Sequence, residues 1–232
     1  MSTLGIVLAA GESSRFPNKL FLPSFTETDG CRIVVQSSLR HLCRLGCEDI
    51  VVVEGPNRLV GNVLRLFHEN VSAVIQPKPL GVVDAIQKAC TICLNSRECK
   101  VIITFGDNIY AEDDMIVLSQ SYATIRRIPP KNNHDLMWNS LDIYEGDRVN
   151  PWEPRRPVNG RNGRFRLAGW LQFVPEDIQR LVTFDPSMTL CEMLNILNVK
   201  GIESEAKWYD LGTPDAYDAY VKEKQRENDS RM

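Results

Sequence analysis

Residues 4–19 read LGIVLAAGESSRFPNK, an apolar run that leads directly into a turn of small polar residues. The run at 4–9 is short, continuous and apolar, which is typical of a parallel strand covered on both faces. Because Gly11 has no β-carbon, a ligand can approach the backbone closely at this position. Successive N–H groups in such a turn bind anions, and Arg15 and Lys19 offer cations just beyond it. The stretch predicts a phosphate site, although an ordinary strand-to-helix turn with two solvated cations fits the same residues.

The alternation of strands and helices continues through the first half of the chain. Three more apolar runs are predicted as strands, at 49–53 (DIVVV), 72–75 (SAVI) and 101–105 (VIITF). Residues 33–45, 59–68 and 82–94 carry apolar side chains at helical spacing. This order of elements predicts a three-layer α/β/α sandwich.

The pattern changes after Asp107. Residues 122–128, 136–144 and 163–174 are predicted as longer strands, which makes the central sheet mixed. Helices are predicted at 175–181, 189–197 and 214–225, with a short strand at 207–211 and a frayed tail at 227–232. With no linker or repeat, residues 1–232 are expected to form a single domain.

Composition excludes several classes of protein. The chain has 232 residues, with 27 Lys and Arg against 30 Asp and Glu, a formal charge of −3. It is too apolar for a disordered chain, and its charge does not suit a nucleic-acid binder that relies on a basic surface. No apolar run is long enough to span a membrane, and the N-terminus lacks the basic region of a signal peptide. We expect a cytoplasmic protein whose seven cysteines are reduced.

Residues 8–19, LAAGESSRFPNK, resemble the N-terminal signature of the nucleotidyltransferases, Leu-Ala-Ala-Gly-x-(Gly/Ser)-x-Arg followed by Lys. These enzymes join a nucleoside monophosphate to a phosphorylated sugar or alcohol. The resemblance implies catalytic roles on the phosphates for Arg15 and Lys19. Only three residues separate these two, fewer than is usual in the family, so the loop is compact. The residues that the resemblance assigns to nucleotide binding here are Leu8, Ala9, Ala10 and Gly11.

Residues 74–89, VIQPKPLGVVDAIQKA, are similar to the family segment Gln-x-x-Pro-x-Gly-x-x-(Asp/His)-Ala, which reads the nucleotide base. The resemblance implies that Gln76 and Gly81 bind the base. A glutamine amide both donates and accepts, which matches the imide edge of a pyrimidine. Asp84 falls in the first turn of the next predicted helix, where the helix dipole alone favours a carboxylate. A tight Pro/Gly turn at the end of a strand is the plainer interpretation of the segment.

Two further motifs each carry an aspartate. The Gly-Asp-Asn at 106–108 follows an apolar strand, and the carboxyl ends of such strands are where open α/β sheets bind ligands. Residues 207–220, KWYDLGTPDAYDAY, are similar to the family's closing Trp-x-Asp-x-Gly-Thr-Pro-x-x-Tyr. The resemblance implies that Asp107 and Asp210 bind Mg²⁺, the expected cofactor, with Asp107 also catalytic. These aspartates must then converge at one sheet edge, whereas a turn cap would explain Asp107 by itself.

The acceptor half resembles the family less closely. Residues 168–175, AGWLQFVP, look like Ala-Gly-x-Tyr-x-Phe-x-Pro, a strand that borders the acceptor site, which implies that Gly169 lies there. Family members with sugar acceptors commonly show Glu-Lys-Pro before this strand, but residues 152–157 read WEPRRP. Arg155 or Arg156 is therefore the candidate for the acceptor phosphate, and an arginine fork differs from a lysine point charge.

The resemblance is strongest to sugar-1-phosphate nucleotidyltransferases of the glucose-1-phosphate thymidylyltransferase kind, with their Rossmann-like nucleotide-diphospho-sugar transferase fold. It implies transfer of a nucleoside monophosphate from a triphosphate to a sugar-1-phosphate, with release of pyrophosphate. Residues 1–110 would bind the nucleotide and residues 111–226 the acceptor. The sequence is compatible with a homo-oligomer as well as with a monomer. A cytidylyltransferase acting on an alcohol phosphate such as phosphocholine is one alternative. A nucleotide-binding regulatory protein with weak catalysis is another.

Overall fold

The computed structural model describes residues 2–11, 16, 18–25, 32–93, 99–110, 120–127, 143–145, 156–158, 165–204 and 206–230. Arg15 and Arg155, two of the site residues predicted from the sequence, lie outside these residues. In the described part of the chain, no helix has the length and apolar character needed to cross a membrane.

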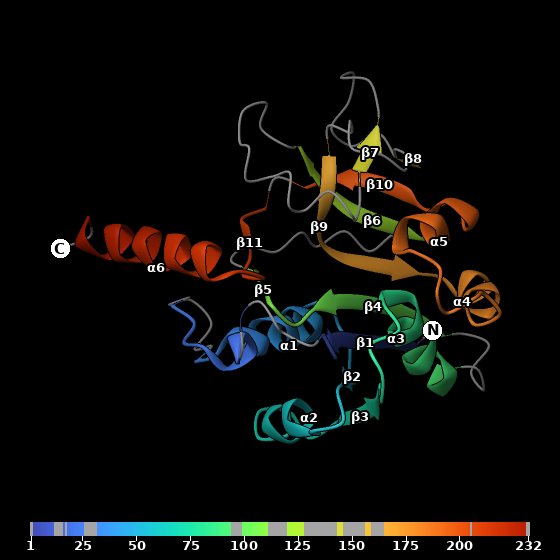
Figure 1. Cartoon of the computed structure of the whole chain (residues 1–232), viewed down its shortest axis with the longest axis horizontal. Coiled ribbons are helices and arrows are strands. Elements are labelled where there is room, and N and C mark those ends of the chain that lie inside the picture. Colours follow the sequence, from blue (N-terminus) through green and yellow to red (C-terminus); the bar gives the residue numbers. More distant parts are fainter. Residues whose placement is uncertain are drawn as a thin grey trace.

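A seven-stranded mixed sheet forms the middle of the molecule (Figure 1), in the order β10-β6-β9-β4-β1-β2-β3. Strands β1 to β4 are parallel to one another, β9 runs antiparallel to both β4 and β6, and β10 pairs with β6 in parallel. The strands are β1 (Ser2–Ala9), β2 (Asp49–Glu54), β3 (Val71–Ile75), β4 (Cys99–Phe105), β6 (Tyr122–Arg127), β9 (Phe165–Phe173) and β10 (Lys200–Glu203). The four apolar runs of the first half are all strands, as predicted.

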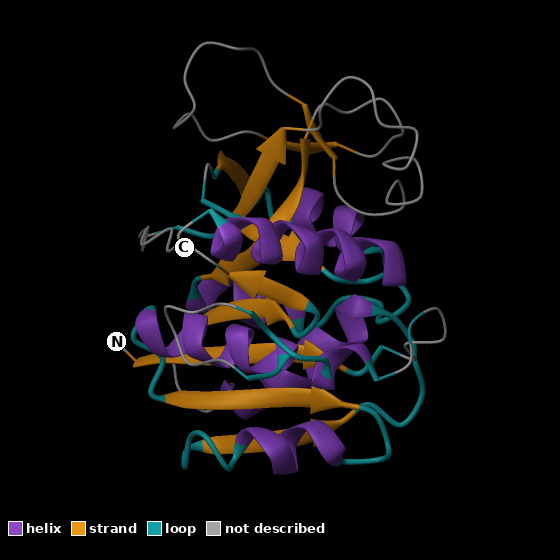
Figure 2. Ribbon diagram, turned by 90° about the vertical axis from the view of Figure 1, so that its left-hand side faces the viewer, coloured by secondary structure: helices purple, strands orange, loops and turns teal. Residues whose placement is uncertain are grey.

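Helices cover both faces of this sheet (Figures 1 and 2). One face carries α3 (Val82–Cys90), α4 (Pro175–Leu181) and α5 (Leu190–Ile196), and the other carries α1 (Val34–Arg44) and α2 (Leu59–Leu64). Side chains alternate between the two cores along β1, since Leu4 and Ile6 join the first and Val7 joins the second. The prediction of a three-layer α/β/α sandwich with a mixed sheet is confirmed.

Smaller elements complete the fold. Strand β5 (Asn108–Tyr110) pairs antiparallel with β11 (Trp208–Asp210), and β7 (Ile143–Glu145) pairs antiparallel with β8 (Arg156–Val158). Short 3₁₀ helices lie at η1 (Lys19–Phe21) and η3 (Thr91–Cys93). Helix α6 (Pro214–Asp229) projects from the body of the molecule and is red in Figure 1. It starts where Thr213 accepts the N–H of Ala216 at 3.2 Å, with proline in the first turn.

One helix end and one strand differ clearly from the sequence prediction. Helix α2 ends at Leu64 rather than at residue 68, because Leu66 and Phe67 are exposed and bury no face. Strand β10 was not predicted, because Gly201 and the charged residues at its ends break the apolar pattern. Most of the predicted strand at 136–144 lies outside the described residues.

Helix α6 extends beyond its predicted end at residue 225. The helix continues to Asp229, so residues 227–229 are helical. The carboxylate of Glu227 forms ion pairs with two ammonium groups, that of Lys207 at 2.6 Å and that of Lys224 at 2.8 Å. Hydrogen bonds from these two ammonium groups lower the pKa of Glu227 to about 2. This pairing holds the last turns of the helix, which the polar sequence by itself did not indicate.

Candidate functional site

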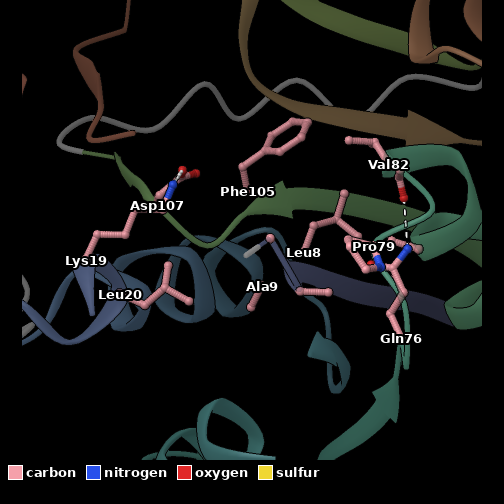
Figure 3. A pocket seen from close by; sticks show the side chains of 13 residues that line it. Leu8, Ala9, Lys19, Leu20, Gln76, Pro79, Val82, Phe105 and Asp107 are labelled. Atoms are coloured by element: carbon pink, nitrogen blue, oxygen red, sulfur yellow. Dashed lines mark hydrogen bonds and ion pairs between the residues drawn. The ribbon is translucent and has the colours of Figure 1, made fainter. Parts of the chain in front are cut away.

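A cavity of about 240 Å³ opens at the carboxyl ends of the parallel strands (Figure 3). Its walls come from the end of β1, the loop between β3 and α3, and the end of β4. Open α/β sheets bind ligands at this edge. The lining residues are Leu8, Ala9, Ala10, Gly11, Lys19, Leu20, Gln76, Pro79, Gly81, Val82, Ala85, Phe105 and Asp107. A second cavity of about 630 Å³ extends over the loop after β2 and shares part of its lining with the first, namely Ala9, Ala10, Gly11, Leu20, Gln76 and Pro79.

The end of β1 forms one wall of the first cavity. The N–H of Gly106 donates to the carbonyl of Leu8 at 2.9 Å, which ties the end of β4 to the end of β1. A β-carbon added at Gly11 would meet no heavy atom of the protein within 4 Å. Packing within the protein therefore does not demand a glycine at this position, and its small size leaves room for a close ligand. The four residues predicted to bind nucleotide on this strand all line the cavity.

Lys19 and Asp107 form an ion pair on the lining of this cavity. Lys19 opens η1 and follows Asn18, whose left-handed backbone (φ 59°) turns the chain toward the sheet. The side chains of Lys19 and Asp107 are 15% and 23% exposed, so the pair is screened only weakly by water. The structure thus brings together two residues that the sequence assigned to the phosphates and the metal.

Asp210 reaches the same sheet edge from the far end of the chain. It lies opposite Asn108 in the pairing of β5 with β11, and the N–H of Leu211 donates to the carbonyl of Asp107 at 2.9 Å. One carboxylate oxygen of Asp210 accepts the N–H of Gly212 at 3.0 Å. The convergence of the two aspartates that the motifs required is therefore present in the backbone.

The donor set at this edge suits a hard cation. Mg²⁺ is bound in many phosphate-handling sites by one or two carboxylates together with substrate oxygens and water. In the described part of the chain, no group of three or more His, Cys, Asp or Glu side chains is placed to hold a metal ion. Asp107 on the cavity lining and Asp210 on the neighbouring strand would leave the other coordination positions to substrate oxygens and water.

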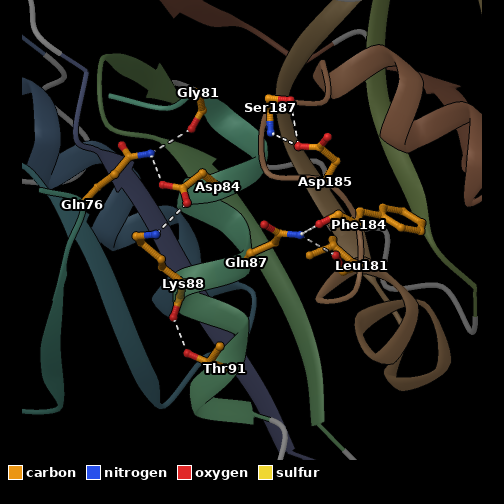
Figure 4. Close-up of polar contacts among 10 residues, drawn as sticks. All are labelled: Gln76, Gly81, Asp84, Gln87, Lys88, Thr91, Leu181, Phe184, Asp185 and Ser187. Atoms are coloured by element: carbon orange, nitrogen blue, oxygen red, sulfur yellow. Dashed lines mark hydrogen bonds and ion pairs between the residues drawn. The ribbon is translucent and has the colours of Figure 1, made fainter. Parts of the chain in front are cut away.

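The loop after β3 forms the opposite wall (Figure 4). Gln76 is 5% exposed, and its backbone N–H donates to the carbonyl of Glu54 at 2.8 Å. Its side-chain nitrogen donates to the carbonyl of Gly81 at 3.0 Å and to the carboxylate of Asp84 at 2.8 Å. Gly81 has φ 116°, a conformation that side chains rarely adopt, and it starts α3. Lys88, one turn along this helix, pairs with Asp84 at 2.6 Å.

Comparison with solved structures identifies the fold. The chain superposes on UTP-bound UGPase from Acinetobacter baumannii with TM-score 0.70 and 16% identity, over 96% of this chain and 93% of that one. A putative glucose-1-phosphate thymidylyltransferase from Bacillus anthracis gives TM-score 0.71 and 15% identity over 94% of each chain. A UDP-glucose pyrophosphorylase complexed with UDP-glucose gives 0.72 and 16% over 96% and 100%. The chain has the nucleotidyltransferase fold. No protein-family model and no curated protein sequence matches it.

Within the nucleotidyltransferase fold, Gly169 on β9 has an evident structural role. Its φ is +101°, and a β-carbon there would lie 2.8 Å from a ring carbon of Tyr110. The hydroxyl of Tyr110 donates to the carbonyl of Gly169. Burial raises the pKa of this hydroxyl, and the charges of Asp107 and Asp210 nearby raise it further. Gly169 therefore braces the strand that follows Asp107, and it does not line the two cavities described above.

Three further side chains near Tyr110 and Gly169 belong to the core of the nucleotidyltransferase fold. His41 is 1% exposed and stacks on Tyr110, with ring centroids 4.2 Å apart. Trp170 packs edge-on against Tyr122, with ring centroids 5.3 Å apart, and Leu171 stands where the family motif has tyrosine. Gln172 donates to the carbonyl of Gln120 at 2.9 Å. His41, Trp170 and Gln172 are all buried.

Sequence reasoning missed most of the apolar wall. Leu20, Val82, Ala85 and Phe105 line the cavity, but nothing in their pattern distinguishes them from core residues. It also gave Asp84 no role beyond the helix dipole, whereas the structure joins Asp84 to Gln76. The spacing of an acid and a lysine at positions 84 and 88 was the one available signal, since such pairs meet on a helix face.

Proposed function

We propose that the chain is a nucleotidyltransferase that moves a nucleoside monophosphate from a nucleoside triphosphate to a sugar-1-phosphate and releases pyrophosphate. The observation that carries the proposal is the ion pair of Lys19 with Asp107 on the lining of a cavity whose other wall is formed by Gln76 and Gly81. The pairing of β5 with β11 brings the backbone of Asp210 to the residue after Asp107. Structures of the same fold include one named as UTP-bound and one complexed with UDP-glucose, which supports a nucleotide and a sugar phosphate as substrates.

The chemistry needs positioning and charge more than it needs proton transfer. An oxygen of the acceptor phosphate, already an anion, forms a bond to the α-phosphorus while the bond from that phosphorus to the bridging oxygen of the β-phosphate breaks. The bridging oxygen leaves with its electron pair as part of pyrophosphate. None of the described residues that line the cavity is a histidine, and this reaction requires no general base. Catalysis of this kind rests on holding the reactants in line and on neutralising charge.

Each wall of the cavity then has a task. Residues 8–11 and the loop from Gln76 to Gly81 hold the nucleoside, while Lys19, with Arg15, faces the phosphates. Asp107 and Asp210 would hold Mg²⁺, which when bound neutralises phosphate charge and favours the departure of pyrophosphate. In this scheme residues 1–110 bind the nucleotide, and residues 111–226 shape the acceptor site, with Arg155 as the acceptor-phosphate ligand and Gly169 as the second residue assigned to that site.

Pyrophosphate release tests the proposal. The protein is incubated with Mg²⁺ and each of UTP, dTTP, CTP, ATP and GTP against glucose-1-phosphate, other sugar-1-phosphates and phosphocholine. We expect release with a sugar-1-phosphate, and we expect Asp107→Asn to lower its rate by about 10³-fold, because a carboxylate that holds a catalytic cation is lost. Asp218→Asn makes the same chemical change at an exposed position on α6 and should leave the rate unchanged.

The outcomes separate the candidate functions. Release only with CTP and phosphocholine would establish the alternative cytidylyltransferase. Nucleotide binding without release against every acceptor would support a nucleotide-binding regulatory protein. Full turnover by Asp107→Asn would refute the role given to the Asp107 carboxylate.

A further inference from the structure

The side-chain amide of Gln76 is held in one orientation by two acceptors. The Gly81 carbonyl and the Asp84 carboxylate lie 3.0 and 2.8 Å from the same side-chain nitrogen. A carbonyl can only accept hydrogen bonds, and so can a carboxylate paired with an ammonium group. The nitrogen of the Gln76 amide must therefore face them, and both of its hydrogens are used. Figure 4 shows the amide oxygen turned away from both partners.

Asp84 is itself held from the other side. One of its oxygens accepts from Gln76 and the other pairs with the Lys88 ammonium at 2.6 Å. Asp84 is 3% exposed, so its hydrogen bonds are shielded from water and are strong for that reason. The carbonyl of Gly81 also receives the N–H of Ala85 at 3.3 Å, which fixes it at the start of α3. In this series of contacts, the Lys88 ammonium and the Gln76 amide nitrogen are the donors, and the two oxygens of Asp84 are the acceptors between them.

This arrangement limits what Gln76 can offer a ligand. Because Gln76 lines the cavity and its nitrogen is committed, the oxygen is the polar atom that its side chain can present. The sequence suggested that Gln76 both donates and accepts, but in the structure it is an acceptor toward the ligand. Its partner must be an N–H group.

We propose that Asp84, paired with Lys88, is a positioning residue that sets which atom of Gln76 meets the nucleotide base. The site then selects a base with an N–H donor in its ring edge, as the imide of uracil or thymine has. The inference rests on the proposed function. Cytosine carries an unprotonated ring nitrogen where the imide has its N–H, and the oxygen of Gln76 repels it. The N–H groups in the first turn of α3, which have no partner within the helix, suit the carbonyl oxygens beside the imide N–H.

Binding of UTP and CTP, each with Mg²⁺ and without acceptor, tests the inference by calorimetry. The wild-type protein should bind UTP at least tenfold more tightly than CTP. In Asp84→Asn, the Lys88 ammonium takes the amide oxygen of the new side chain, so the amide nitrogen of that side chain faces Gln76. The Gln76 amide then faces a donor at position 84 and an acceptor at the Gly81 carbonyl, so no single orientation satisfies both contacts and its oxygen is no longer fixed toward the cavity. We expect the preference for UTP to fall by about tenfold, the equivalent of about 1.4 kcal/mol or one hydrogen bond.

A second variant tests the direction of the chain of contacts. In Asp84→Asn with Lys88→Met, no ammonium dictates the orientation at position 84. The new amide can turn its oxygen to Gln76, and the preference for UTP should return to within about threefold of wild type, since an uncharged acceptor is restored. A purely structural role for Asp84 predicts the opposite, because the double variant loses more contacts than the single one.

Gln87→Met serves as the matched control. Gln87 lies on α3 beside Lys88, and its side-chain nitrogen also donates to two carbonyls, those of Leu181 and Phe184, at 2.9 and 2.8 Å (Figure 4). Its loss should lower stability to denaturant without changing the ratio of UTP to CTP affinity.

Each outcome decides something. A wild-type protein that binds no nucleotide overturns the proposed function and this inference with it. A wild-type protein that binds CTP as well as UTP overturns the inference alone. An unchanged ratio in Asp84→Asn, or no recovery in the double variant, shows that Asp84 does not orient Gln76. A fallen ratio that recovers supports the inference.

Discussion

The ion pair between Lys19 and Asp107 predicts opposite effects of one substitution on two ligands. In the structure the Lys19 ammonium contacts the carboxylate that would bind the metal. A divalent cation that binds without nucleotide must displace this ammonium. A triphosphate, by contrast, is attracted by the positive charge of this ammonium group. Lys19→Met, which keeps the length of the side chain and removes its charge, should therefore strengthen binding of the metal alone and weaken binding of the nucleotide.

The size of the effect follows from the burial of the pair. A hydrogen bond between charged groups contributes about 1.5–3 kcal/mol when it is mostly shielded from water, and these side chains are only 15% and 23% exposed. Removing the competitor should tighten binding of Mn²⁺, used as a probe for the metal site, by about 10- to 150-fold. The loss of one ammonium near a triphosphate should weaken UTP binding by a similar factor of about tenfold or more.

Mn²⁺ titration followed by electron paramagnetic resonance measures the first effect, and calorimetry with UTP measures the second. Lys222→Met removes the same charge from an exposed position on α6 and controls for the change in net charge. Equal Mn²⁺ affinity in the wild type and Lys19→Met would refute the competition. Equal UTP affinity would remove Lys19 from the phosphate site.

Two further predictions concern the core around Tyr110. Gly169→Ala should destabilise the protein by roughly 2–4 kcal/mol in urea unfolding, since it combines an unfavourable φ of +101° with a contact at 2.8 Å. Gly46→Ala, with φ +80° and open space around it, should cost only about 1 kcal/mol. Burial, with the charge of Arg44, lowers the pKa of His41 to about 3, so unfolding takes up a proton below about pH 6.5. Stability should therefore fall by about 1.4 kcal/mol per pH unit from pH 6.5 toward 3, and His41→Phe should flatten this slope in urea titrations.

The first half of the fold could be predicted from the sequence because its strands are buried on both faces. Such strands are continuous apolar runs, and each is followed by a helix with one apolar face. Strand β10 escaped prediction, because Gly201 and its charged end residues leave too short an apolar run. Helix α2 was predicted too long, because Leu66 continues the helical spacing but is 80% exposed. Periodicity reports which face could be buried, whereas the packing partner decides whether it is.

For the candidate site, too, the sequence could locate some residues but not the contacts between them. Motifs located Gln76, Asp107 and Asp210 at strand ends, because sharp changes from apolar to polar residues mark those ends. They could not show that a lysine of the site contacts Asp107, or that Asp84 orients Gln76, since such pairings depend on three-dimensional approach. The roles of Arg15 and Arg155 stay predictions, as both lie outside the described residues.

One small cluster of the core joins the elements near Lys19, Asp107 and Asp210. Val34, Ile109, Leu211 and Tyr220 pack together, which joins α1, β5, β11 and α6. The hydroxyl of Tyr220 accepts the N–H of Phe25 at 2.8 Å. Phe25 lies a few residues after η1, and η1 begins with Lys19. The C-terminal helix therefore fixes both the strand that carries Asp210 and the segment that carries Lys19. Residues outside the cavity lining thus hold the geometry on which the proposed chemistry depends, so the candidate site draws on described residues from both the first and the last part of the sequence.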